Sequence, residues 1–355
     1  MMLTILSSPF KHTHRSTPAI MAWVALAACP GIIAQWYFFG PGSFIQIVLC
    51  ILTAWITEGI VLKLRNRSVL STLRDHSALV TAILLGISIP GYAPWWVAVL
   101  GTIFAILLAK QLYGGLGQNI FNPAMAAYVF LLISFPVAMT GWIPPLSLIK
   151  LPLQFGDSLH LIFTGFTLDG FSLHQIANSA DSISQATPLN ALKTGITLGH
   201  SVPSILATPL FDSFAGIGWN AMNAGFLLGG LFLLWQRIIR WHIPVMFLAT
   251  FAIFSLIGHW FAPEHIASPL VDLFSGATML GAFFILTDPV TASTTPKGRL
   301  IYGSMIGALV FIIRHIGGYP DGVAFAVLIA NMCVPLLDHL TQPRVYGHRG
   351  KSSHE

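Results

Sequence analysis

Long runs of apolar residues, separated by short polar segments, dominate this chain. A helix needs about 20 apolar residues to cross the hydrocarbon layer of a membrane. Runs of about that length predict spans over residues 18–39, 43–62, 77–91, 94–112, 122–141, 216–235, 242–261, 267–286, 300–316 and 321–338. The third run is short and contains proline, so the third and fourth runs are also compatible with re-entrant segments. The pattern predicts an all-α polytopic membrane protein with about ten transmembrane helices.

One long polar segment divides the predicted helices into two equal groups. Residues 1–141 form the first membrane half, 142–215 the polar loop, 216–341 the second membrane half and 342–355 a terminal tail. Because each half holds five spans, an odd number, the two halves have opposite orientations. This arrangement is typical of inverted-repeat transporters and channels, so the sequence predicts a 5+5 inverted repeat.

The composition agrees with a membrane location. Only 8% of the 355 residues are charged and 55% are hydrophobic, whereas soluble domains carry about 25% charged residues. The net charge of +5 does not indicate nucleic-acid binding, because Lys and Arg lie at the ends of apolar runs. The three cysteines lie inside apolar runs without a C-x-x-C pair, and the histidines lack metal-binding spacing. We therefore assign no metal.

The distribution of Lys and Arg predicts the topology. With the N-terminus in the cytoplasm and the spans alternating, all but three of the 17 basic residues fall on the cytoplasmic side. The exceptions are Lys150, Lys193 and Arg314. The first apolar run, of about 22 residues, is too long for the apolar core of a signal peptide. We therefore expect both termini in the cytoplasm and the polar loop on the outer face.

A seven-residue stretch in the polar loop suggests a cofactor. It reads Asp-Ser-Ile-Ser-Gln-Ala-Thr and ends at Thr187. It resembles the D-x-x-[ST]-x-A-T acceptor on which flavin mononucleotide (FMN) is attached through a phosphodiester to the Thr hydroxyl. Thr187 would supply the nucleophilic oxygen, Ala186 would leave room for the phosphoryl donor, and Asp181 would help to bind metal or position the transferase. Ser184 fills the [ST] position, but glutamine precedes Ala186 where glycine is more usual. Such short matches also occur in ordinary loops.

A second stretch satisfies the same pattern. It runs from Asp272 to Thr278, and its Ser-Gly-Ala-Thr core is the closer match. Thr278, however, lies about eleven residues into the run 267–286, where a charged phosphodiester is costly and a soluble transferase could hardly reach it. Thr187 is therefore favoured, with Thr278 as the alternative acceptor. The pair Arg314-His315 near the outer face either neutralises a flavin phosphate or anchors its helix at the interface.

Three carboxylates near the ends of the spans are candidates for a sodium or proton route. Intramembrane carboxylates are costly and so suggest function. Glu58 lies inside a span, but only five residues from Lys63, and a salt bridge with that residue is nearly as good an explanation. Asp288 and Asp338 lie at the ends of their spans and also fit a purely interfacial role.

Taken over its whole length, the chain resembles a family of membrane flavoproteins. The family contains the RnfD subunit of Rnf-type (also called Rsx) ion-translocating electron transport complexes and the related NqrB subunit of the sodium-pumping NADH:quinone reductase. The stretches that carry the resemblance are residues 7–12, 114–124, 184–189, 192–195 and 275–292. The glycine-rich stretch 114–124 and the stretch 279–292 are long enough to be specific.

The resemblance implies an electron-transfer subunit in a bacterial inner membrane. It implies covalent FMN on Thr187, a second noncovalent flavin such as riboflavin, and a soluble flavin transferase for maturation. It also implies partner subunits that carry iron–sulfur clusters and flavins, and coupling of electron flow from the ferredoxin or NADH side to cation transport. The residues themselves provide no stand-alone catalytic site. The alternative is a ten-helix channel or secondary transporter without a redox cofactor.

Overall fold

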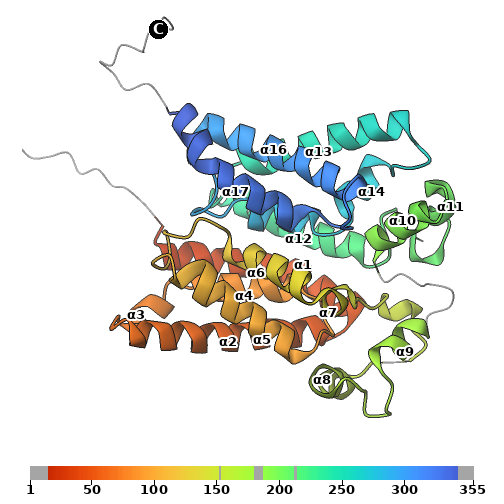
Figure 1. The fold of residues 1–355 in the computed structure, drawn as a ribbon, viewed down its shortest axis with the longest axis horizontal. Coiled ribbons are helices and arrows are strands. Elements are labelled where there is room, and N and C mark those ends of the chain that lie inside the picture. The colour runs from red at the N-terminus through yellow and green to blue at the C-terminus, as the bar shows by residue number, and fades with distance from the viewer. Residues whose placement is uncertain (1–14, 152, 180–186, 212–213, 343–355) are drawn as a thin grey trace, which may run out of the picture.

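A computed structural model describes residues 15–151, 153–179, 187–211 and 214–342, and within these ranges every regular element is a helix (Figure 1). The first half contains α1 (Thr17–Phe39), α2 (Gly42–Leu64), α3 (Val69–Leu73), α4 (Ser77–Ser88), α5 (Trp95–Ile103), the π-helix η1 (Phe104–Gln111), α6 (Pro123–Ser134) and α7 (Pro136–Thr140). The polar loop contains η2 (Leu146–Leu148), α8 (Phe155–Thr164), α9 (Leu173–Asn178), α10 (Pro188–Thr197), α11 (Val202–Leu206) and η3 (Pro209–Phe211). The second half contains α12 (Trp219–Trp235), α13 (His242–Phe261), α14 (Pro269–Phe274), α15 (Thr278–Leu280), the π-helix η4 (Gly281–Ile285), α16 (Pro296–His315) and α17 (Val323–Leu340).

The prediction of an all-α polytopic membrane protein is confirmed. Five helices, α1, α2, α13, α16 and α17, are long and apolar enough to cross a membrane. Shorter apolar helices accompany them, and many large apolar side chains on the long helices are exposed. Since lipid solvates such side chains, this exposure is expected for helices within a membrane.

Two of the predicted continuous spans are interrupted. The span over 122–141 divides at Phe135, which separates α6 from α7 where Pro136 cannot continue the hydrogen-bond ladder. The span over 267–286 divides into α14, α15 and η4, with the break at Ser275–Ala277. Hydropathy alone missed both breaks, because the residues at them are as apolar or as small as those within the helices.

The two halves share one packing scheme. In the first half, α2 packs against α4, α5 and η1, and η1 packs against α6. In the second half, α13 packs against α14, η4 and α16, and α16 packs against α17. The halves meet through corresponding helices, α1 with α12 and α6 with α17. The order of helices and their partners therefore repeats.

Glycines allow the closest contact between the halves. A Cβ atom on Gly225 would lie 2.8 Å from Pro30 O, and one on Gly229 would overlap Ala27 O. The residue number falls on α1 as it rises on α12, so the two helices run antiparallel, as Figure 1 also shows. Small residues let helix backbones approach closely in a membrane, where dispersion contacts contribute much of the association.

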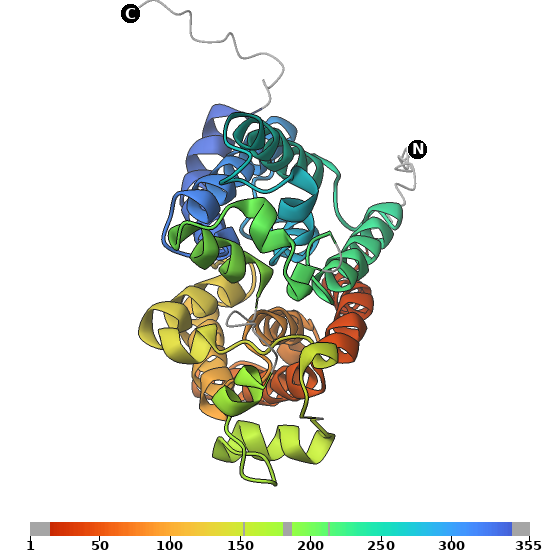
Figure 2. The same cartoon turned by 90° about the vertical axis from the view of Figure 1, so that its right-hand side faces the viewer.

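The helices of the polar loop gather at one end of the bundle, here called the loop end (Figures 1 and 2). In Figure 2, α8 and α9 lie beside the first half, and α10 and α11 lie beside the second. A small apolar cluster that includes Leu192, Ile205 and Val271 joins α10 and α11 to α14. The loop therefore covers the bundle end instead of projecting from it.

Candidate functional site

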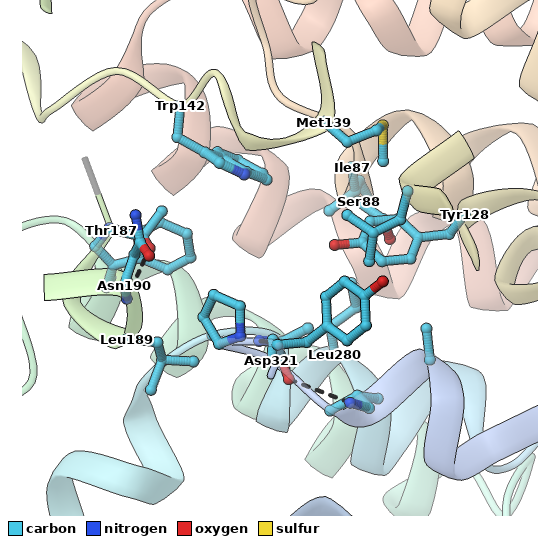
Figure 3. A pocket seen from close by; sticks show the side chains of 18 of the residues that line it. Ile87, Ser88, Tyr128, Met139, Trp142, Thr187, Leu189, Asn190, Leu280 and Asp321 are labelled. Atoms are coloured by element: carbon cyan, nitrogen blue, oxygen red, sulfur yellow. Dashed lines mark hydrogen bonds between the residues drawn. The ribbon is translucent and has the colours of Figure 1, made fainter. Parts of the chain in front are cut away.

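A cavity opens between the two halves at the loop end. Its empty volume is about 1180 Å³, including the part that is open to solvent. The wall residues come from α1, α4, α6 and α7 of the first half, α12, α15, η4 and α17 of the second, and α10 of the loop. Figure 3 shows Thr187 and Asn190 on one side of this space and Ser88 and Met139 across from them. Binding sites in inverted-repeat membrane proteins lie at such an interface.

The walls are largely apolar and aromatic. Tyr128, Trp142, Trp219 and Tyr319 are among the residues that line the cavity. The rings of Trp142 and Trp219 have centroids 5.8 Å apart, and Trp219 makes an edge contact with Phe39 at 5.4 Å. An apolar, aromatic cavity with a few polar groups is the usual form of a small-molecule or cofactor site.

The structure places Thr187 at the mouth of this cavity, as the N-cap of α10. Its Oγ1 accepts a hydrogen bond from Asn190 N at 3.2 Å, and Pro188 occupies the first helical position. Threonine before proline is a favourable helix start, because the hydroxyl satisfies one free N–H and proline has none to satisfy. Thr187 is half-buried, and Leu189 packs within van der Waals reach of Gly276 on the opposite half.

Lys193 fixes α10 to the end of α16. Its Nζ donates to Arg314 O at 3.2 Å, Tyr319 O at 3.1 Å and Gly317 O. A cation at a helix C-terminus satisfies carbonyl groups that have no partner within the helix. Partial burial lowers the pKa of Lys193 from 10.5, whereas the three carbonyls favour the charged ammonium. We expect the ammonium to persist at neutral pH.

The helix break at Ser275–Ala277 forms part of the cavity wall. Gly276 has a φ of +60°, a conformation that favours glycine. The backbone groups released by the break have side-chain partners. Asn223 Nδ2 donates to Phe274 O at 2.9 Å and to Gly276 O at 3.1 Å, and Asp321 Oδ2 accepts from Ala277 N at 2.8 Å. The break is thus a built feature of the fold.

Arg314 lies beneath this break, so the predicted interface anchor or phosphate partner is wrong. The side chain is buried, with 4% of its surface exposed. It donates to Asp272 O at 2.8 Å, Thr278 Oγ1 at 3.1 Å and Asp321 Oδ1 at 3.2 Å. His315 Nε2 lies 3.0 Å from Asp272 Oδ2. The sequence placed Arg314 at a helix end, but the fold bends α14 and the 316–322 connection around it.

Thr278, the alternative acceptor, has no exposed surface. Its Oγ1 donates to Ser275 O at 2.9 Å or Asp272 O at 3.2 Å, and it accepts from Arg314. A hydroxyl with these partners is already used in holding the helix break. The geometry therefore keeps Thr187 as the more accessible hydroxyl of the two.

Glu58 pairs with a residue that sequence reasoning did not consider. Its Oε1 lies 2.6 Å from Lys110 Nζ and accepts from Gln111 Nε2 at 2.7 Å, and the side chain is 0% exposed. Lys110 Nζ also reaches Ser77 Oγ at 2.7 Å. The expected snorkelling pair with Lys63 is therefore replaced by a buried ion pair between α2 and η1.

Asp288 and Asp338 lie at the opposite end of the bundle from the loop end. Asp288 Oδ2 accepts from Thr291 Oγ1 at 2.8 Å. Asp338 accepts from Ser293 Oγ at 2.5 Å and Thr294 Oγ1 at 2.8 Å. Both carboxylates therefore bond to the single turn 291–294, whereas Glu58 belongs to the first half. The route for a cation through these carboxylates stays a prediction.

Two polar atoms in the cavity walls were missed by sequence reasoning. Gln35 Oε1 and Trp219 Nε1 are buried and have no hydrogen-bond partner in the protein. Gln35 within an apolar run was the only available signal, and nothing in the sequence related it to Trp219. Buried polar groups without partners are rare and call for an explanation.

The rest of the predicted acceptor motif lies outside the described residues, namely Asp181, Ser184 and Ala186. Within the described part of the chain, no group of three His, Cys, Asp or Glu side chains is arranged to hold a metal ion.

These features define a class: a polytopic all-α membrane protein with two inverted halves and a ligand-sized cavity between them. A family model described as the NQR2, RnfD, RnfE family matches residues 4–347, and the chain belongs to that family. Proteins named as the D-type subunit of an ion-translocating oxidoreductase complex are similar over nearly their full length. The chain is 62% identical to that of Yersinia enterocolitica (98% of this chain, 99% of the relative), 57% identical to that of Erwinia tasmaniensis (98% and 99%) and 59% identical to that of Yersinia pseudotuberculosis (99% and 100%). The family predicted from the sequence is confirmed.

Proposed function

We propose that this chain is the flavin-carrying membrane subunit of an ion-translocating oxidoreductase complex, with FMN attached to Thr187. The single observation that supports the proposal most is the position of Thr187 at the mouth of an aromatic cavity between the two halves. The relatives that carry the name of such a subunit support the role in a complex. Bound FMN would supply electron transfer, which no side chain here provides.

The start of α10 suits a phosphodiester. Thr187 is the N-cap of a helix that runs to Thr197, so the N–H groups of Leu189 and Asn190 point toward its side chain. The N-terminus of a helix favours negative charge through these free N–H groups and the helix dipole. A phosphate on Oγ1 would therefore lie where the backbone stabilises it, without a basic side chain.

The cavity suits the flavin ring. Its walls offer aromatic faces for a planar ring, and two buried polar atoms without protein partners offer hydrogen bonds. Gly276 and Leu189 hold the acceptor helix against the second half, which keeps the attachment point beside the cavity. Thr187 would hold the phosphate, and the cavity residues would orient the ring and exclude water.

The partners follow from the same proposal. The complex would supply other membrane subunits and subunits that carry iron–sulfur clusters and flavins, and a soluble transferase would attach the FMN. A second, noncovalent flavin such as riboflavin, the inner-membrane location and cytoplasmic termini belong to the proposal as well. The buried ion pair of Glu58 and the turn that holds Asp288 and Asp338 are the proposed cation route.

In-gel flavin fluorescence of the denatured protein tests the attachment. The chain is expressed with its flavin transferase as wild type, Thr187→Ala, Thr278→Ala and Thr194→Ala, the last as a matched control within α10. We expect fluorescence to be lost only in Thr187→Ala. Loss only in Thr278→Ala would assign the flavin to the buried hydroxyl instead. A dark wild type, with transferase shown to be active on another substrate, would favour the channel or secondary transporter.

A further inference from the structure

Gln35 and Trp219 come from the two helices that join the halves. Gln35 lies on α1 and Trp219 at the start of α12, and both line the cavity. A Cβ on Gly218, the residue before Trp219, would lie 2.8 Å from Phe38 Cβ, so the start of α12 lies against the last turns of α1. The crossing therefore brings an amide oxygen and an indole N–H to the same wall.

Both groups are held in place by neighbours that leave one polar atom unused. Gln35 Nε2 donates to Ile87 O at 3.3 Å, which fixes the amide and leaves Oε1 as an acceptor without a partner. The Trp219 ring is held between Phe39 and Trp142, and its Nε1–H has no acceptor. Leaving a buried donor or acceptor unsatisfied costs about 1–3 kcal/mol. A ligand in the cavity would remove this cost.

The chemistry of the ligand follows from the two groups. A donor and an acceptor on one wall complement a ring edge in which an N–H lies next to a carbonyl. The isoalloxazine ring has one such edge, the imide of its pyrimidine ring, where N3–H stands between two carbonyls. Its opposite, dimethylbenzene edge has neither donor nor acceptor.

We propose that Gln35 Oε1 accepts a hydrogen bond from flavin N3–H and that Trp219 Nε1–H donates to an adjacent flavin carbonyl. This inference rests on the proposed function and adds the orientation of the ring. The imide edge faces the crossing of α1 and α12, and the remaining edge faces away from it. Gln35 and Trp219 are positioning residues, and they select a ring with an imide over a planar ring without one.

The test uses free ring analogues, so that it does not depend on covalent attachment. The full-length Thr187→Ala chain in detergent is titrated with lumiflavin and with 3-methyllumiflavin, in which a methyl group replaces the N3 hydrogen. Quenching of flavin fluorescence reports binding. We expect lumiflavin to bind about tenfold more tightly than its methyl analogue, as the loss of one buried hydrogen bond predicts.

Variants of the wall assign the preference to its source. Gln35→Leu should bind both analogues with nearly equal affinity, because the acceptor is gone. Trp219→Phe should weaken both analogues by a similar factor, because its partner is a carbonyl that both retain. Gln46→Leu is the matched control: Gln46 is buried, donates to Ala93 O at 2.5 Å and has an unpaired Oε1, but it does not line the cavity. This control should keep the preference.

Equal binding of the two analogues to the Thr187→Ala chain overturns the inference without any wall variant, and so does a preference that survives in Gln35→Leu. Failure of both analogues to bind overturns it as well. In-gel fluorescence of the chain with Thr187 intact reports the proposed function separately. A labelled wild type with no preference for N3–H leaves the covalent flavin standing and removes only the orientation of its ring.

Discussion

Lys193 gives the sharpest prediction about how the acceptor helix is held. Its ammonium donates to three carbonyl groups at the end of α16 and in the connection that follows. A hydrogen bond from a charged donor contributes about 1.5–3 kcal/mol net when it is buried. Because Lys193 is only half-buried, solvent weakens each bond. We therefore expect Lys193→Met to destabilise the docking of α10 by about 1–3 kcal/mol in total.

Hydrogen–deuterium exchange measures this change directly. A loss of about 1–3 kcal/mol corresponds to a fall of about 5- to 150-fold in the protection of amides that exchange by local opening of α10. The amides of α8 serve as an internal control, since α8 packs against α2. Lys193→Arg keeps the charge and should recover part of the protection. Unchanged exchange of α10 in Lys193→Met would refute the reasoning, because the three bonds would then contribute nothing to docking.

Two further changes test the bundle itself. Gly225→Ala places a Cβ 2.8 Å from backbone of α1, about 0.6 Å inside ordinary contact, and should destabilise the chain by about 1–3 kcal/mol. In Gly59→Ala the nearest atom is 3.7 Å away, so thermal melting in detergent should separate the two. Lys110→Met leaves the buried carboxylate of Glu58 without its cation and should cost about 3–5 kcal/mol. Adding Glu58→Gln should recover stability in the same assay, and a double variant as unstable as Lys110→Met would contradict the ion-pair account.

The sequence by itself determined the class of fold, because membrane insertion depends on the apolar content of each segment and not on what the segment packs against. Runs of apolar residues identified the long helices, and an odd number of spans in each half indicated opposite orientations. A short polar pattern identified Thr187 as the favoured acceptor, and longer stretches identified the family. These signals are local, so the sequence carries them without a fold.

Only the tertiary structure decided which residues meet. Arg314 lies in an ordinary helix end by sequence, yet the break in the preceding span surrounds it with carbonyl and carboxylate partners. Glu58 has a lysine five residues away but pairs with Lys110, about fifty residues distant, because α2 and η1 lie side by side. Gln35 and Trp219 share a wall because two helices from opposite halves cross. Buried polar groups take whichever partner packing brings into reach, and packing is a property of the whole chain.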